Sequence, residues 1–252
     1  MYRLPRRMTL GETSGEGKVS ARASIGELRE RSLHRALKQR YAAGGGRTET
    51  AVDGYIADVM LGNRIIEIQT GDFYPLKRKL PPLLANHEVT LVYPVAKDRY
   101  LVKRRDDPHV PAKRRLSPRH GSPFAVFGVL PSIASLLEHP NLTLEVVMVI
   151  EEEIRVPNAG RRRWGREWVR ADHRLLEVVE THTIGRMADL FAMVDPGLPD
   201  RFTARHLAET MQAPRRLAQQ AAFCFREAGV TAICGKEERA LLYRRCASPR
   251  HR

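Results

Sequence analysis

The sequence has little cysteine, few aromatic residues and no long apolar run. Its 252 residues include Cys224, Cys234 and Cys246, an odd number whose spacing fits no metal motif, which argues against a disulfide framework and a zinc finger. The densest apolar stretch, residues 144–150, contains a glutamate and is too short to cross a bilayer. The first residues carry no apolar segment of the kind that directs secretion. These absences predict a cytoplasmic protein without membrane segments.

Acidic residues are also scarce relative to basic ones. The chain has 43 lysines and arginines against 29 aspartates and glutamates, which gives a formal net charge of +14 at pH 7. Hydrophobic residues make up 42% of the sequence, enough for a folded core. An excess of positive charge on a folded protein favours a polyanionic partner. Because nothing indicates a membrane, we expect nucleic acid, and double-stranded DNA first.

Hydrophobic periodicity divides the first two thirds of the chain into helices and strands. A helix is expected over 24–42, opened by a capping box at Ser24 and ended by AAGGGR. Three strands follow within 47–70, and then a helical segment over 73–87 that the Pro81-Pro82 pair should kink or split. The other expected elements are strands at 88–96 and 99–105, a Pro-rich basic loop at 106–123, a helix at 124–138, and strands at 142–151 and 173–180.

A two-residue turn at Gly62-Asn63 would fix how the second and third of these strands pair. Such a turn is typical of a β-hairpin, and it sets Leu61 opposite Arg64. Since side chains alternate between the two faces along a strand, Asp58 is then expected directly opposite Glu67. Gln69 follows two residues later on the same face, whose other members are Ile56, Met60 and Ile65. The pairing predicts two carboxylates that meet on an otherwise apolar face.

Two opposed carboxylates need a positive charge between them. Like charges directly opposite each other destabilise a strand pair, and apolar neighbours increase the cost. Mg²⁺ is commonly held by one or two carboxylates together with substrate phosphates. We therefore expect Asp58 and Glu67 to bind Mg²⁺ or Mn²⁺, and Gln69 to orient a water or a phosphate oxygen. The alternative is a longer turn or a solvated face, in which the two carboxylates never meet.

The stretch ETAVDGYIADVMLGNRIIEIQT, within the order helix, three strands, helix, strand over 24–105, resembles the PD-(D/E)xK nuclease superfamily. The resemblance implies a restriction-endonuclease-like core and metal-assisted hydrolysis of phosphodiester bonds. It makes Asp58 and Glu67 the metal-binding acids and places Gln69 where most members carry lysine. Two departures stand out, because no proline precedes Asp58 and because Gln69 removes a cation from the site.

Further site residues follow from the same resemblance. The missing cation would come from Lys77 or Lys79 on the next helix, unless both are solvated surface lysines. Holliday-junction resolvases and transposase endonuclease subunits add a glutamate from the first helix. Glu30, at the edge of the apolar stripe, fits that role better than the capping residue Glu27. The alternative for Glu30 is an exposed helix residue between two arginines.

From about residue 185 the pattern becomes helical. Three short amphipathic helices and a closing hairpin resemble a winged helix over 185–246, whose recognition helix would enter the major groove of DNA. The side chains expected to contact DNA lie off the apolar stripe of that helix and on the wing: Arg215, Arg216, Gln219, Gln220, Lys236 and Arg239. The alternative is a winged helix that packs against protein.

We therefore expect an α/β protein in four parts. They are a flexible basic arm (1–22), a nuclease-like domain (23–180) with an extension from about residue 106, a winged-helix domain (185–246) and a tail (247–252). The predicted function is that of a Mg²⁺-dependent DNA endonuclease targeted by the winged helix. Two alternatives stay open: a catalytically silent regulatory DNA-binding protein, and a junction or RNA nuclease. Assembly as a homodimer or with a partner subunit also stays open.

Overall fold

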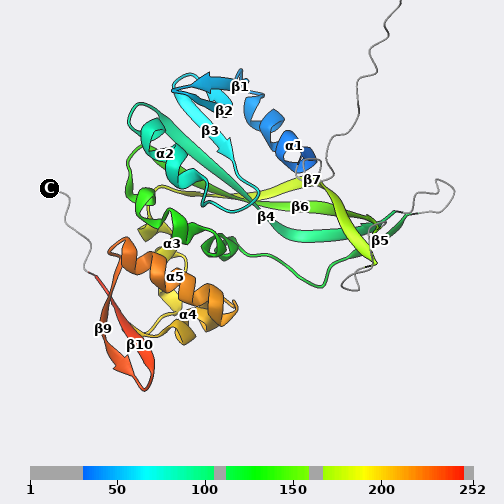
Figure 1. Ribbon diagram of the computed structural model, residues 1–252. Coiled ribbons are helices and arrows are strands. Elements are labelled where there is room, and N and C mark those ends of the chain that lie inside the picture. Colours follow the sequence, from blue (N-terminus) through cyan, green and yellow to red (C-terminus); the bar gives the residue numbers. More distant parts are fainter. Residues whose placement is uncertain (1–30, 105–111, 159–166, 247–252) are drawn as a thin grey trace, which may run out of the picture.

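A computed structural model describes residues 31–104, 112–158 and 167–246 (Figure 1). The predicted arm, tail and capping box lie outside these ranges. The helices are α1 (Arg31–Ala42), α2 (Leu76–Leu84), α3 (Met187–Ala192), α4 (Ala204–Thr210) and α5 (Arg215–Glu227), with 3-10 helices η1 (Pro123–Gly128), η2 (Leu130–Ser132), η3 (Ala134–Glu138) and η4 (Asp195–Gly197). The strands are β1 (Arg47–Val52), β2 (Tyr55–Leu61), β3 (Arg64–Ile68), β4 (Glu88–Lys103), β5 (Lys113–Leu116), β6 (Leu142–Pro157), β7 (Trp168–Ile184), β8 (Arg201–Phe202), β9 (Thr231–Glu237) and β10 (Ala240–Arg245).

The larger sheet is mixed and has the strand order β1-β2-β3-β4-β6-β7, with β5 paired to β4. Strands β1, β2 and β3 form an antiparallel meander, and α2 then crosses over so that β4 runs parallel to β3. Strand β6 is parallel to β4, and β7 is antiparallel to β6. The predicted order of helix, three strands, helix and strand is confirmed, as is the α/β class.

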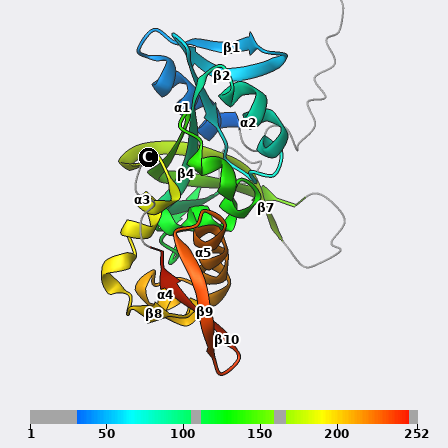
Figure 2. The ribbon, with the colours of Figure 1, turned by 90° about the vertical axis from the view of Figure 1, so that its left-hand side faces the viewer.

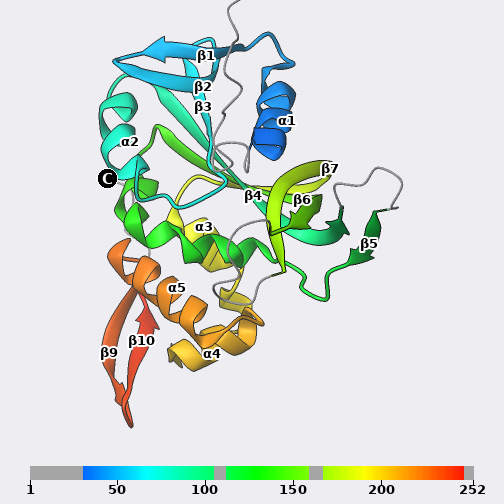
Figure 3. The same ribbon diagram turned by 45° about the vertical axis from the view of Figure 1, so that its right-hand side comes forward.

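Helices cover both faces of this sheet (Figure 3). On one face Leu33 and Leu37 of α1 pack with sheet residues such as Val59 and Ile66. On the other face the buried leucines of α2 and the 3-10 helices join a larger core. Strands β3, β4 and β6 send alternate side chains to the two clusters, as the pleat of a sheet requires.

The C-terminal helices share that larger core. Phe127 of η1 meets Phe225 of α5 edge to face, with ring centroids 5.2 Å apart, and Phe191 of α3 contacts the same ring at 5.0 Å. The second sheet, in the order β8-β10-β9, lies beside these helices. Its β9–β10 hairpin projects at the end of the molecule opposite β1 and β2 (Figure 2). The two predicted domains are therefore joined by one continuous apolar interior.

Helix α2 runs through Pro81 and Pro82 as a single element, so the prolines do not split it. The two prolines leave the carbonyls of Lys77 and Arg78 without helical donors. Both prolines and both of these residues are exposed, so water can bind the carbonyls. Four leucines keep the opposite side of the helix buried, and their packing stabilises it: Leu76, Leu80, Leu83 and Leu84.

Several predicted boundaries in the middle third are also wrong. The strands expected at 88–96 and 99–105 are one strand, β4, which passes through a bulge between Ala96 and Asp98. The basic loop contains β5, and β6 and β7 are longer than expected because they pair with each other almost throughout. The helix expected at 124–138 is a series of 3-10 helices interrupted at Val129 and Ile133. In the described ranges no helix is both long and apolar enough to span a membrane.

Candidate functional site

The β2–β3 hairpin carries both predicted metal-binding acids. Its turn is the predicted Gly62-Asn63 pair, in which Gly62 has a φ of 60°, a value that favours glycine. The register begins with Leu61 opposite Arg64 and runs to Val59 opposite Ile66, as predicted. The ladder ends at that pair, one position before the two acids.

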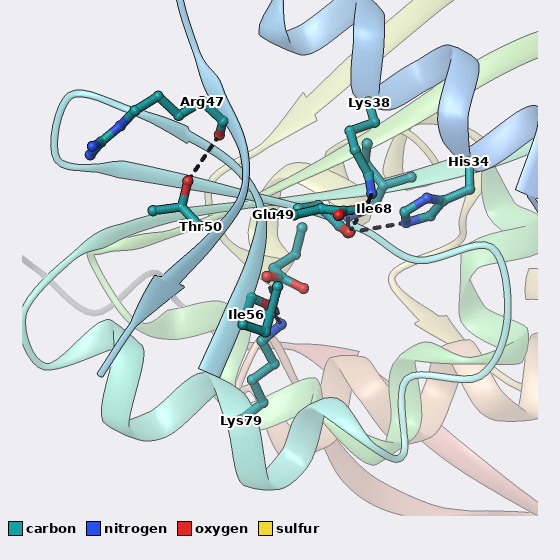
Figure 4. A network of polar contacts seen from close by, with 10 residues as sticks. His34, Lys38, Arg47, Glu49, Thr50, Ile56, Ile68 and Lys79 are labelled. Carbon is teal, nitrogen blue, oxygen red and sulfur yellow. Dashed lines mark hydrogen bonds and ion pairs between the residues drawn. The ribbon is translucent and has the colours of Figure 1, made fainter. Parts of the chain in front are cut away.

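Asp58 is directed toward α1. Its Oδ2 lies 3.1 Å from Nε2 of His34 and accepts the backbone N–H of Ile68 at 2.9 Å (Figure 4). Its Oδ1 lies 3.7 Å from Nζ of Lys38. Since His34 and Lys38 are four residues apart on α1, their side chains face the same point. Asp58 is thus held by one backbone donor and two helix side chains.

Glu67 is directed toward α2 instead. It is only 6% exposed, and its Oε1 lies 2.7 Å from Nζ of Lys79. The same ammonium group donates a hydrogen bond to the carbonyl of Ile56 at 2.7 Å, which fixes its position between the helix and β2 (Figure 4). The buried carboxylate therefore has a cation of the protein itself as its partner.

The two carboxyl groups have pKa values displaced in opposite directions. Burial raises the pKa of Asp58, but the hydrogen bonds from His34 and Ile68 and the charge of Lys38 outweigh it, so that pKa lies below its usual range. Burial also raises the pKa of Glu67, and the charge of Asp58 adds to this effect. Lys79 and the backbone N–H of Asp58 oppose it only in part, so the pKa of Glu67 is raised.

The hairpin register predicts that the two carboxylates oppose each other on one face of the sheet. In the structure they do not. Ala57 packs in the core on the α2 side, whereas Val59 packs under α1, so the alternation of faces is interrupted between them. The β1–β2 ladder also omits Asp58, and Glu49 beside it has a positive φ of 51°. Turning Asp58 toward α1 replaces a like-charge contact with two basic partners, which is the physical reason for the irregularity.

The other predicted site residues lie at different distances from the acids. Of the two candidate lysines, Lys79 contacts Glu67, whereas Lys77 is exposed and forms no ion pair within the described ranges. Gln69 is half-buried, and its Nε2 donates to the carbonyl of Asp72 at 2.6 Å. Glu30 lies outside the described residues.

Sequence reasoning missed His34 and Lys38 as members of this site. Each follows a buried leucine of α1, Leu33 or Leu37, and so lies at the edge of the apolar stripe. Lys38 also pairs with Glu49 of β1, with 3.0 Å between Nζ and Oε1. A basic residue repeated at a spacing of four beside that stripe is the signal that could have found them.

The predicted DNA-contacting residues are largely exposed. Arg215, Arg216 and Gln219 lie on the open side of α5. Gln220 differs, because its Nε2 donates to the carbonyl of Gly128 at 3.4 Å and so faces the 3-10 helices. On the hairpin, exposed Lys236 and Arg239 flank Glu237 and Glu238, so the wing has no net charge at its tip.

The site has few side chains that could bind a metal ion. Over the described parts of the chain, no three histidine, cysteine, aspartate or glutamate side chains gather in a group that could hold an ion. The site offers the two carboxylates of Asp58 and Glu67. Hard oxygen donors of this kind suit Mg²⁺, which one or two carboxylates can hold together with phosphate oxygens.

Comparison with known proteins gives two matches. The model of a family described as a domain of unknown function, DUF8091, matches residues 31–185, from the start of α1 to the residue after β7. An uncharacterized protein of Treponema pallidum (strain Nichols) is 33% identical over 189 residues, which cover 74% of this chain and 74% of that protein. No solved structure matches.

Proposed function

The chain belongs to the DUF8091 family, and we propose that it is a metal-dependent nuclease that hydrolyses phosphodiester bonds in DNA. One observation carries the proposal. Two buried or half-buried acids, Asp58 and Glu67, lie on adjoining strands one position beyond the last pair of their ladder, and basic side chains from the helices on both faces contact them. Such a group combines anionic ligands for a cation with positive charge for a phosphate.

The donor atoms of the two acids fit a divalent cation in chemistry and charge, although Asp58 is directed toward α1 and Glu67 toward α2. Asp58 has a lowered pKa and is ionised at neutral pH, and the pKa of Glu67 is raised first by burial, which Lys79 offsets only in part. Asp58 and Glu67 would hold the ion through hard oxygen atoms. When bound, a divalent cation supplies Lewis acidity toward the phosphate and makes water more acidic.

The remaining residues of the site position the acids and balance charge. His34 and the N–H of Ile68 orient the Asp58 carboxylate. Lys79 is the cation nearest to Glu67 and would stabilise negative charge that develops on a phosphate, the role that Gln69 cannot perform. The order α1, β1–β3, α2, β4 agrees with the restriction-endonuclease-like core that the sequence resembles, and this supports the proposal.

The C-terminal part would bind the DNA. Its order of elements, α3, β8, α4, α5, β9 and β10, is that expected of a winged helix, with α5 as the recognition helix. The exposed face of α5 carries Arg215, Arg216 and Gln219, which are suited to phosphates and base edges. The net charge of +14 supports a polyanionic substrate.

A second candidate is a DNA-binding protein on a catalytically silent scaffold. The observation that favours it is that each acid already has basic partners, Lys38 and His34 for Asp58 and Lys79 for Glu67. Gln69 is moreover engaged with the carbonyl of Asp72. In this version the charge network stabilises the hairpin and the helices around it.

Cleavage of supercoiled plasmid by the full chain in Mg²⁺ or Mn²⁺ distinguishes the two candidates. Asp58→Asn and Glu67→Gln keep the shape of each side chain and remove its charge. Asp53→Asn is the matched control, because Asp53 is an exposed acid on the neighbouring turn that pairs with His87. The nuclease proposal expects nicking by the wild type and by the control variant, and none by the other two.

Binding to the same DNA is measured in parallel in the presence of EDTA. Equal background nicking in all four proteins, together with unchanged DNA affinity, would reject the nuclease and leave the silent scaffold. Nicking that persists in both Asp58→Asn and Glu67→Gln would place the activity elsewhere or in a contaminant.

A further inference from the structure

A cavity of about 330 Å³ lies between the bulge of β4, the segment 117–125 and β7. Its volume is near the lower end of the range for small-molecule sites. The cavity is distinct from the acidic site, because neither Asp58 nor Glu67 lines it. Leu33 and Thr70, neighbours in sequence of His34 and Gln69, form its wall toward that site.

The lining is strongly basic. Arg99, Arg119 and Arg170 face the cavity with a single carboxylate, that of Glu151. Arg99 is already engaged, because its Nε donates to Glu151 at 2.6 Å and its Nη1 to Glu153 at 3.4 Å. Arg119 and Arg170 are exposed, and their guanidinium groups have no ion-pair partner within the described ranges. Two free guanidinium groups beside a cavity favour an anion such as phosphate.

The inner wall holds a buried pair of titratable groups. Nδ1 of His173 lies 2.9 Å from Oε1 of Glu151, and both residues are more than nine-tenths buried. A carboxylate at Nδ1 makes this nitrogen a donor, which leaves Nε2 as the other hydrogen-bonding atom of the ring. Nε2 is itself buried and has no hydrogen-bond partner among the described residues. A hydroxyl group of a ligand would satisfy it.

Another part of the wall is apolar. Leu33, Tyr93 and Val95 supply hydrocarbon surface. Gly121 donates to the carbonyl of Ala96 at 3.0 Å, and a side chain at Gly121 would overlap that oxygen, so the outer segment lies directly against β4. The cavity is thus a formed pocket with a cationic end, an unpartnered ring nitrogen and an apolar side.

We propose that this cavity binds a small organic phosphate that carries hydroxyl groups, namely a sugar phosphate or a mononucleotide. Arg119 and Arg170 bind the phosphate, and Nε2 of His173 forms a hydrogen bond with a hydroxyl group. Leu33, Tyr93 and Val95 contact the carbon skeleton. The site does not depend on the nuclease proposal, because it shares no residue with the acidic pair.

Isothermal titration of the full chain with ribose 5-phosphate and with AMP tests the site and distinguishes the two sources of the phosphate. Ribose and adenosine are the uncharged controls, and inorganic phosphate tests the anion alone. We expect one of the organic phosphates to bind at least about tenfold more tightly than its uncharged control and than inorganic phosphate. Binding in the absence of divalent cations keeps this result separate from any nuclease activity.

Variants assign the binding to this cavity. Arg119→Gln and Arg170→Gln should each weaken binding of the organic phosphate about tenfold or more, because each removes a charge-assisted hydrogen bond. Arg174→Gln is the matched control, since Arg174 is an exposed arginine of the same strand as Arg170 and does not line the cavity. His173→Phe should weaken the organic phosphate and leave inorganic phosphate unaffected.

Three results would overturn the proposal. The first is that neither organic phosphate binds. The second is that Arg119→Gln and Arg170→Gln bind as the wild type does. The third is that a 5′-phosphorylated oligonucleotide displaces the bound AMP or ribose 5-phosphate and binds more tightly at the same two arginines, which would assign the pocket to the end of a DNA strand.

Discussion

The rings of Phe127 and Phe225 meet edge to face, with their centroids 5.2 Å apart, and join the 3-10 helices beneath the sheet to α5. Both side chains are fully buried, and Phe191 packs on the same ring of Phe225. The C-terminal helices therefore complete the core of the sheet. We expect the sheet and these helices to unfold together, as a single cooperative unit.

Phe225→Ala should lower the free energy of unfolding by about 3–5 kcal/mol, the usual cost of truncating a buried phenylalanine. Phe223→Ala is the control on the same helix. Its ring is 38% exposed, so we expect a loss under about 1 kcal/mol. Urea denaturation followed by tryptophan fluorescence is informative because Trp168 lies on β7, in the sheet. A Phe225→Ala protein whose sheet signal keeps its midpoint would contradict the shared core.

The two site acids should affect stability in opposite directions. Asp58 has a lowered pKa, so its ionised form stabilises the fold; this contribution is complete above pH 3.8 and is lost as the pH falls through the folded pKa. Glu67 has a raised pKa, so its protonated form stabilises the fold. This contribution is complete below pH 4.5 and is lost as the pH rises through the folded pKa. At neutral pH, ionised Glu67 is therefore a cost to the fold.

We expect Asp58→Asn to lower the free energy of unfolding at pH 7 by about 1–3 kcal/mol, since it weakens charge-assisted hydrogen bonds. Glu67→Gln should raise it, because the amide avoids the burial of a charge and Lys79 keeps its bond to the carbonyl of Ile56. Thermal unfolding at pH 7 and near pH 4.5 measures both effects, and the advantage of Glu67→Gln should shrink at the lower pH. Equal losses in both variants would contradict the assigned pKa directions.

The β2–β3 hairpin could be predicted from the sequence because its information is local. Gly62-Asn63 specifies the turn, and the turn specifies the register as far as Val59 and Ile66. The direction of Asp58 could not be predicted in the same way. It depends on the irregular β1 strand at Glu49 and on α1, whose packing is set by contacts distant in the sequence.

The cavity depends even more on contacts between residues that are distant in the sequence. Arg99 and Glu151 are register partners of β4 and β6, and His173 comes from β7. Strand patterns ending near 151 and 180 underestimate how far β6 and β7 pair, because each of these strands is extended by its neighbour rather than by its own residues. The Glu151–His173 pair therefore has no signal in the sequence.

DNA binding through α5 should respond to its two arginines more than to the wing. Arg215→Gln and Arg216→Gln should each weaken binding and lower the slope of log affinity against log salt by about 0.9, if each arginine contacts one phosphate. Lys236→Gln should change binding less, because Glu237 and Glu238 beside it already offset its charge. Fluorescence anisotropy with a labelled duplex over a salt series measures the slopes. A slope unaffected by either arginine variant would remove α5 from the interface.

Gly121 should be far more sensitive to substitution than Gly128. A Cβ at Gly121 would overlap the carbonyl oxygen of Ala96, which is backbone and cannot rotate away, whereas a Cβ at Gly128 meets only Cδ1 of Leu217, at 3.8 Å. Gly121→Ala should therefore lower the free energy of unfolding by about 1–3 kcal/mol and displace the outer wall of the cavity. Gly128→Ala should be neutral or stabilising by up to about 1 kcal/mol, because alanine restricts the unfolded chain. Urea midpoints compare the two, and equal midpoints would mean that the segment 117–125 does not lie against β4 in solution.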